Sequence, residues 1–98
     1  LKRQGGKHAM YKEDVILKNK TGLHARPASL FVREAAKFSS DIKIIKDNKE
    51  YNAKSIMGIL SMGAGQGDSI TIQAAGEDAK EAIESLIQLV NDKFNEKE

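Results

Sequence analysis

The sequence predicts an α+β fold in which helices cover one face of a mostly antiparallel β-sheet. Two observations lead to this prediction. Short stretches alternate between apolar and polar residues, most regularly over residues 69–74, and two longer stretches, 25–38 and 79–94, carry apolar residues at helical spacing. A chain of 98 residues is long enough to bury one core and too short for two.

Residues 1–9 are set apart from the predicted domain, which covers residues 10–98. They hold two adjacent glycines and three cations without apolar periodicity, so we expect a flexible tail or an expression remnant, in which His8 has no role. The net charge is +2, but residues 10–98 contain 13 basic and 14 acidic residues. A nearly neutral domain gives no reason to expect nucleic acid or an anionic membrane as a ligand.

Other composition features narrow the function classes. The chain has no cysteine, which excludes disulfides and thiolate metal sites and fits a cytoplasmic location. Its two histidines lie far apart in the sequence and make a poor metal site. No apolar run approaches the roughly 20 residues of a membrane-spanning helix. We therefore expect no metal, no cofactor and no membrane insertion.

The first half of the domain begins with a strand predicted over residues 11–18, whose centre is apolar. Residues 19–22, Asn-Lys-Thr-Gly, are typical of a loop, because asparagine and threonine bond nearby backbone and glycine adopts conformations closed to other residues. A helix should follow from about Ala25 to Phe38, ended by Ser39-Ser40. Strands at 41–46 and 49–52 should then form an antiparallel hairpin.

A short helix is expected after Ser55, which is a suitable N-cap. Gly58 weakens this helix, so we expect about two turns or fewer. Two turns cannot bury four large apolar residues on one face, so part of this set should form an exposed docking surface: Ile56, Met57, Ile59 and Leu60. We assign docking to Ile56, Met57 and Leu60, and the alternative is that all four belong to the core.

The last third of the domain starts with a glycine-rich stretch, residues 62–68. It lacks the ending and context of a phosphate-binding loop, so it is interpreted as a turn-rich connection. The strand at 69–74 follows. The final helix should run over residues 79–94, with Asp78 as its N-cap and Glu81 in a capping-box position, and it is assigned no chemistry.

The chemistry-bearing residues lie at the start of the first long helix. Pro27, the only proline, is tolerated in a first helical turn, which places His24 at or next to the N-cap. The free N–H groups and dipole of a helix start favour anions and disfavour a charged imidazolium, while Arg26 can donate to phosphate oxygens. The residues suggest a histidine that accepts a phosphoryl group. A capping or packing histidine beside a solvated arginine is the alternative.

Two motifs carry a family resemblance. Residues 21–29 read Thr-Gly-Leu-His-Ala-Arg-Pro-Ala-Ser, and residues 54–63 read Lys-Ser-Ile-Met-Gly-Ile-Leu-Ser-Met-Gly. With both motifs at the family's separation, the chain from about Met10 onward resembles the histidine-containing phosphocarrier HPr of the bacterial phosphoenolpyruvate-dependent sugar phosphotransferase system. The resemblance implies an open-faced β-sandwich of order βαββαβα, with sheet order 1-4-2-3 and three helices on one face.

The resemblance also implies roles for individual residues. His24 matches the histidine phosphorylated at Nδ1 (the pros nitrogen), Arg26 the active-site arginine, and Ser55 the serine phosphorylated by a dedicated kinase. The implied partners are enzyme I, the A components of sugar permeases, HPr kinase/phosphorylase and a catabolite-control transcription factor. The protein would be a stoichiometric carrier and not an enzyme, and we expect a monomer.

Three alternative functions are disfavoured by the sequence. A regulatory, non-transporting paralogue would typically lack the histidine, so His24 beside Arg26 argues against it. A nitrogen-regulatory phosphocarrier would use the same chemistry, but the motif at 54–57 favours the sugar branch. A self-sufficient enzyme is disfavoured, because the sequence has no nucleotide loop, metal cluster or second acid/base pair.

Overall fold

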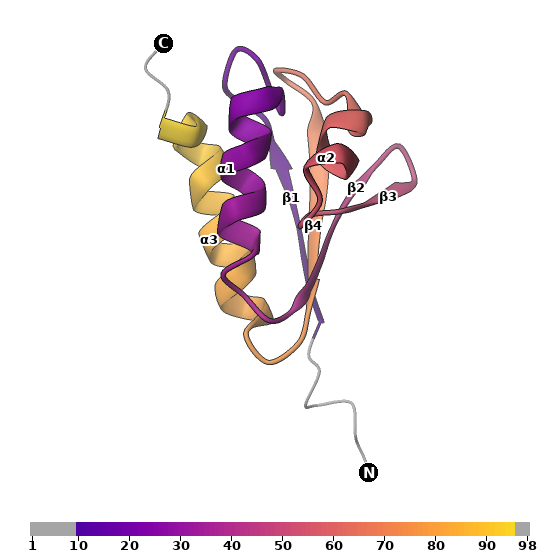
Figure 1. The fold of residues 1–98 in the computed structure, drawn as a ribbon, viewed down its shortest axis with the longest axis vertical. Helices are drawn as coiled ribbons and strands as arrows, with labels where there is room; N and C mark the ends of the chain where they lie inside the picture. Colours follow the sequence, from indigo (N-terminus) through magenta and orange to yellow (C-terminus); the bar gives the residue numbers. More distant parts are fainter. Residues whose placement is uncertain (1–9, 96–98) are drawn as a thin grey trace.

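The computed structural model describes residues 10–95, so the tail assigned to residues 1–9, with His8, lies outside the described part, as do residues 96–98. The sheet contains β1 (Met10–Ile16), β2 (Asp41–Lys46), β3 (Lys49–Asn52) and β4 (Ser69–Ala75), and the helices are α1 (Ala25–Ala35), α2 (Ile56–Met62) and α3 (Ala79–Asn91), followed by the 3-10 turn η2 (Lys93–Asn95). All strand pairs are antiparallel and the order is β1-β4-β2-β3 (Figure 1). The predicted fold class and sheet order are confirmed.

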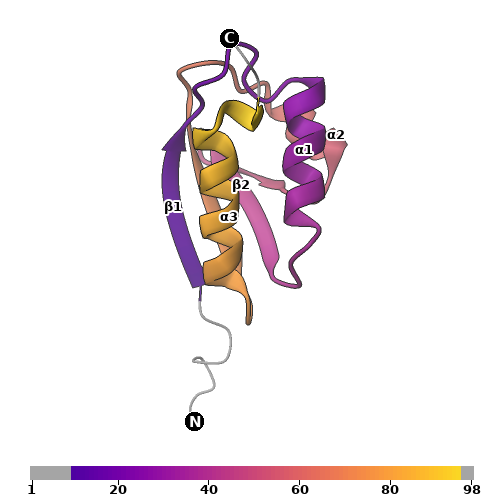
Figure 2. The same ribbon diagram turned by 90° about the vertical axis from the view of Figure 1, so that its left-hand side faces the viewer.

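One face of the sheet is buried and the other is open. Along β2, Ile42 and Ile44 are buried while Asp41 is exposed, and the same alternation runs along β4. Alternate strand residues point to opposite faces, so these positions define a single core side. Helices α1 and α3 lie over that side (Figures 1 and 2), and α1 packs against both α2 and α3. Within residues 10–95, no helix has the length and apolar character needed to span a membrane.

The core draws large side chains from strands, helices and the segments between them. Burial of each such side chain away from water contributes about 1.5–3 kcal/mol to the free energy of folding. The largest apolar side chains with almost no exposed area are Leu17, Phe31, Ile44, Ile59, Ile70, Ile72, Leu86, Val90 and Phe94.

The β2–β3 hairpin has a tight two-residue turn. Only Asp47 and Asn48 separate the strands, and both have positive φ, 54° and 67°. Positive φ at both central residues matches the twist of antiparallel strands, and Asp and Asn tolerate it better than most residues. The strand boundaries at 41–46 and 49–52 were predicted correctly.

Helix α1 ends at Ala35, three residues before the predicted Phe38, and Ala36 is exposed. The N–H groups of Lys37 and Phe38 bond to the carbonyls of residues 34 and 35, which tightens the chain out of α-helical geometry. After Phe38, hydrogen bonds with residues remote in the sequence hold the chain. The ammonium of Lys54 donates to the Phe38 carbonyl oxygen at 2.7 Å.

Helix α3 also ends earlier than predicted, at Asn91 instead of Phe94. The chain then turns with positive φ at Lys93, Phe94 and Asn95, so the last apolar residue of the stripe is not helical. Phe94 is nevertheless fully buried, and η2 packs against α1 and α3. Burial of the Phe94 ring contributes about 1.5–3 kcal/mol to folding, which offsets part of the left-handed backbone cost of about 1–2 kcal/mol per residue.

Strand β1 ends at Ile16, not at residue 18, because the chain after it pairs with a loop instead of a strand. The N–H of Leu17 donates to the Asp68 carbonyl at 2.9 Å, and the N–H of Gly67 donates to the Leu17 carbonyl at 2.8 Å. Further along, the N–H of Leu23 donates to the Ala64 carbonyl at 3.0 Å. The loop after β1 (residues 17–24) is therefore held along its length by the loop before β4 (residues 63–68).

Gly22 lies where these two loops approach most closely. Its φ is +62°, and a Cβ there would lie 2.5 Å from both the Ala64 carbonyl oxygen and the Gly65 Cα. The side-chain amide of Asn19 donates to the Gly22 carbonyl at 2.9 Å. Gly22 is thus required by both its backbone conformation and the space around it.

Asp78 is the N-cap residue of α3, as predicted, but its side chain makes no capping hydrogen bond, contrary to the capping-box prediction. Its carboxylate instead reaches the segment after α1. One oxygen accepts the Ser39 N–H at 2.9 Å, and the other accepts the Ser40 N–H at 3.0 Å and the Ser40 hydroxyl at 2.5 Å. The Ser40 hydroxyl, followed by the backbone N–H of Ser39, lowers the pKa of Asp78 to about 2.

Glu34 joins α1 to α3 in a similar way. It accepts a hydrogen bond from the Ser85 hydroxyl on α3 and forms an ion pair with Lys37 at 2.9 Å. The hydrogen bond from Lys37, and then that from Ser85, hold the pKa of Glu34 below its usual range. Both carboxylates are therefore stabilised in the ionised form.

We expect replacement of Asp78 by asparagine to change how stability depends on pH. The pKa of Asp78 is about 2 in the folded state against 3.8 when unperturbed, so its stabilising effect is present above pH 3.8 and is lost as the pH falls toward 2. Urea unfolding between pH 2 and 7 should show wild type and Asp78→Asn converging at low pH. The exposed neighbour Glu77, changed to glutamine, is the control, and parallel wild-type and Asp78→Asn curves would contradict the assignment.

Gly22→Ala should destabilise the protein more than Gly63→Ala does. The two glycines have φ of +62° and +68°, but a Cβ at Gly63 meets no atom within 4 Å. Both variants therefore carry the left-handed backbone cost of about 1–2 kcal/mol, and Gly22→Ala adds an overpacking cost of about 1–3 kcal/mol. Denaturant unfolding of the two variants measures the difference. Equal losses would show that the two loops are not tightly packed at Gly22.

Candidate functional site

The candidate site is built around His24, which is the N-cap of α1 as predicted. Its φ and ψ are −84° and −171°, an extended conformation, and its carbonyl accepts the Ala28 N–H at 2.8 Å as the first bond of the helix. The imidazole makes no capping hydrogen bond, and the residue is exposed. The structure therefore does not support the capping and packing alternative, because the His24 ring makes no capping bond and is accessible to solvent.

The helix start next to this ring has unused donors. Within residues 10–95, no backbone acceptor pairs with the N–H groups of Ala25 and Arg26, and Pro27, the third helical residue, has no N–H to satisfy. Pro27 is buried and fixes the backbone of the first turn. Two N–H groups and the positive end of the helix dipole thus lie beside His24, an arrangement that attracts anions.

Arg26 is the second residue of α1 and is exposed. In the described part of the chain, its guanidinium forms neither a hydrogen bond nor an ion pair. Arginine presents a planar set of donors that matches phosphate oxygens. The structure therefore leaves Arg26 available for an anion near the helix start.

A cleft of about 460 Å³ adjoins His24. One wall comes from the start of α1 and the residues before it, and the other from the end of α2 and the loop before β4. Its main lining residues are Leu23, His24 and Ala25 on the first wall and Leu60, Gly63 and Ala64 on the second. The structure thus brings Leu60, assigned to docking, to the same cleft as His24.

The four apolar residues of α2 divide between surface and core. Ile59 is fully buried, whereas Ile56, Met57 and Leu60 are 42%, 77% and 37% exposed. The alternative that all four are core residues is therefore wrong. The three exposed side chains, called the α2 patch below, lie on the helix that packs beside α1 (Figure 1).

Ser55 is the N-cap of α2, as predicted, and its hydroxyl oxygen accepts the Gly58 N–H at 3.1 Å. The residue is half-exposed and precedes the α2 patch directly. Lys54, which belongs to the same motif, donates a hydrogen bond to the Phe38 carbonyl in the segment after α1. Sequence reasoning missed that bond, since nothing local in the sequence indicates a partner 16 positions away.

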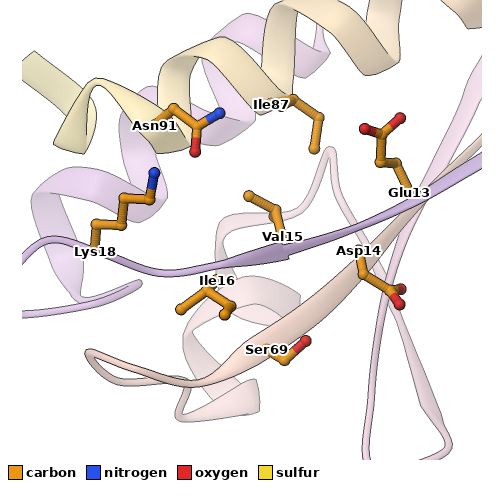
Figure 3. Close-up of a pocket in the computed structure, with 8 residues that line it drawn as sticks. All are labelled: Glu13, Asp14, Val15, Ile16, Lys18, Ser69, Ile87 and Asn91. Atoms are coloured by element: carbon orange, nitrogen blue, oxygen red, sulfur yellow. The ribbon is translucent and has the colours of Figure 1, made fainter.

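A second hollow, of about 390 Å³, lies between β1 and α3. Figure 3 shows Val15 and Ile87 facing each other across it, with Glu13 at one end and Lys18 and Asn91 at the other. Its lining contains no histidine or arginine. In residues 10–95, no group of three or more His, Cys, Asp or Glu side chains is placed to hold a metal.

Comparisons with known proteins agree with this geometry. Residues 11–92 match the family model described as the PTS HPr component phosphorylation site. The chain is 52% identical to the HPr-like protein Crh of Halalkalibacterium halodurans over an alignment of 81 residues. This alignment covers 83% of this chain and 96% of that protein. The chain is 49% identical over 83 residues to the phosphocarrier protein HPr of Mycoplasma capricolum, covering 85% and 93% of the two chains.

Solved structures give the same result. The HPr structure of Thermoanaerobacter tengcongensis superposes with a TM-score of 0.87 at 53% identity and covers 90% of this chain and 99% of its own. The phosphocarrier protein HPr of Bacillus anthracis gives 0.81 at 54% identity, with 84% and 98% covered. The fold, the sequence match and the paired motifs agree, and the chain belongs to the HPr family.

Proposed function

We propose that this protein is a phosphocarrier of the sugar phosphotransferase system. His24 takes a phosphoryl group from a phosphohistidine of enzyme I and passes it to the A component of a sugar permease. The observation that carries this proposal is the exposed His24 ring at the start of α1, which has no capping duty and lies beside free donors. Membership of the HPr family and the relative named phosphocarrier protein HPr support it.

The transfer exchanges one phosphorus–nitrogen bond for another. A lone pair on the His24 Nδ1 attacks phosphorus while the bond to the donor imidazole breaks and its electron pair returns to the donor ring. The proton that the His24 ring releases at Nε2 balances the proton that the donor ring takes up, so the donor leaves as a neutral imidazole. Charge on the transferred oxygens is spread over the N–H groups of Ala25 and Arg26 and the Arg26 guanidinium. Each protein molecule carries one group per cycle and is a stoichiometric intermediate without turnover of its own.

The α2 patch and the cleft beside His24 form the proposed docking surface. An exposed methionine flanked by branched apolar side chains adapts to more than one partner, which suits a carrier that meets a donor and then an acceptor. Leu60 belongs to both the patch and the cleft wall. A partner seated on α2 would therefore also contact the cleft beside His24.

A regulatory role in catabolite repression is the second candidate function. Relatives named Crh include one described as the catabolite repression HPr of Bacillus subtilis, 49% identical to this chain with a TM-score of 0.62. Ser55 is half-exposed and adjoins the α2 patch, and a phosphate there would add about −1.5 to −2 charge. HPr kinase/phosphorylase and a catabolite-control transcription factor would be the partners in this role.

A monomer remains our prediction for the oligomeric state of this protein. Structures related to this chain include one described as an HPr dimer of Thermoanaerobacter tengcongensis and one of Crh as a swapped dimer. Those assemblies are properties of the proteins concerned. Light scattering of this chain is the measurement that decides its own state.

The carrier function is tested by incubating the protein with enzyme I, phosphoenolpyruvate and Mg²⁺. We expect one acid-labile phosphoryl group by intact mass and phosphorus NMR, and none on His24→Ala. Arg26→Ala should keep its fold but accept the group about 10- to 100-fold more slowly, since it loses one pre-organised charged donor. Arg33, exposed on the last turn of the same helix, is the control when changed to alanine. An unchanged rate for Arg26→Ala would remove the role given to Arg26.

Ser55→Asp should preserve the fold and reduce phosphoryl acceptance at His24. Aspartate is as good an N-cap as serine, so α2 is retained while a negative charge appears beside the α2 patch. Ser55→Asn is the matched neutral control, and Ser55→Ala should cost about 0.5–2 kcal/mol through loss of the cap. Transfer rates and urea unfolding are measured on all three. Equal transfer by the Asp and Asn variants would limit Ser55 to capping.

A further inference from the structure

The loop that faces the His24 segment is rich in glycine. Gly63, Gly65 and Gly67 occupy alternate positions between α2 and β4, and glycine has the widest backbone freedom of any residue. Added Cβ atoms at these three positions would meet nothing within 4 Å. The positions where side chains would attach on these glycines are open, so the loop is ordered by its contact with Gly22 and by hydrogen bonds.

Asp68 supplies several of those hydrogen bonds, beside the bonds from the Gly67 N–H to the Leu17 carbonyl and from the Gln66 side-chain amide to the Lys18 carbonyl. Its carboxylate accepts the Gly65 N–H at 2.8 Å, and its own N–H donates to the Gly65 carbonyl at 3.1 Å, so both side chain and backbone close the turn over residues 65–68. The carbonyl of Asp68 accepts the Leu17 N–H at 2.9 Å. One residue thus closes the turn and fixes it to the end of β1.

The turn is connected to His24 by direct contacts. The peptide between Ala64 and Gly65 packs against Gly22, and the Ala64 carbonyl accepts the Leu23 N–H at 3.0 Å. Leu23 immediately precedes His24. The same loop also forms one wall of the cleft beside the imidazole.

We infer that Asp68 is a positioning residue for phosphoryl transfer at His24, an inference that rests on the proposed function. The carboxylate holds Gly65, the 64–65 peptide holds Gly22 and Leu23, and these hold the backbone that carries the imidazole. Without the carboxylate, the glycine-rich turn gains conformations and this support loosens. Misplacement of a reacting group by about 1 Å can cost on the order of 100-fold in rate.

The test compares Asp68→Ala, Asp68→Asn and Asp41→Ala as acceptors for enzyme I charged with phosphoenolpyruvate. Asp41→Ala is the control, because Asp41 pairs in register with Ala75 at the opposite end of β4 from Asp68. We expect Asp68→Ala to lower the kcat of enzyme I with this protein as acceptor about 10-fold. The KM for the acceptor should stay unchanged, since the α2 patch still docks. Asp68→Asn should restore most of the rate, because its amide oxygen can accept the Gly65 N–H.

These measurements separate positioning from a general loss of stability. Partial unfolding lowers the concentration of competent protein, so it raises the apparent KM and leaves kcat intact. A variant with that pattern, or an Asp68→Ala protein with the wild-type kcat, would overturn the inference. Failure of Asp68→Asn to recover would overturn it as well.

Hydrogen exchange of the Leu23 amide tests the same geometry without phosphoryl transfer. It should be faster in Asp68→Ala than in wild type, and near the wild-type rate in Asp68→Asn and Asp41→Ala. A wild-type protein that accepts no phosphate would refute the proposed function. Unchanged Leu23 exchange in Asp68→Ala would refute the positioning role alone.

Discussion

The contact between the loop after β1 and the loop before β4 is the constraint on which the candidate site depends. Gly22 fits against the Ala64–Gly65 peptide with no room for a side chain, and the Leu23 N–H bonds to the Ala64 carbonyl. This contact sets where α1 begins and therefore where His24 projects. It also joins the segment that bears His24 to the end of α2, so the reactive ring and the exposed apolar patch form one surface.

The opposite end of the fold is held by different chemistry. There the carboxylate of Asp78 accepts hydrogen bonds from Ser39 and Ser40, and the ammonium of Lys54 bonds to the Phe38 carbonyl. These polar bonds fix the C-terminal side of α1, while the packed loops fix its N-terminal side. The helix is thus secured at both ends, while within residues 10–95 the N–H groups of Ala25 and Arg26 at its start have no backbone acceptor. Because both ends of α1 are held by the rest of the fold, the candidate site at its start can lie at the surface and still keep a defined geometry.

Under the proposed function, an exposed site suits a phosphoryl group that has to pass to another protein. A deep pocket would stabilise a bound phosphoryl group and shield it from the next protein, whereas His24 is exposed and adjoins an open cleft. Few groups are needed for phosphoryl transfer beyond positioning and charge stabilisation, so one histidine, one arginine and two backbone N–H groups can suffice when a partner supplies the rest. The division of apolar residues in α2 between core and surface serves the same end.

The sequence by itself determined the elements that depend on local patterns: the four strands, the three helices and their order, the N-cap positions of His24 and Ser55, and the motifs that indicate the family. The sheet order came from that resemblance and not from periodicity. Only the tertiary structure decided where α1 and α3 end, where the Asp78 carboxylate bonds, and that Asp68 holds the turn against the His24 segment. The physical reason is that apolar spacing and capping preferences act over a few residues, whereas these features depend on hydrogen bonds and packing between segments that are remote in the chain.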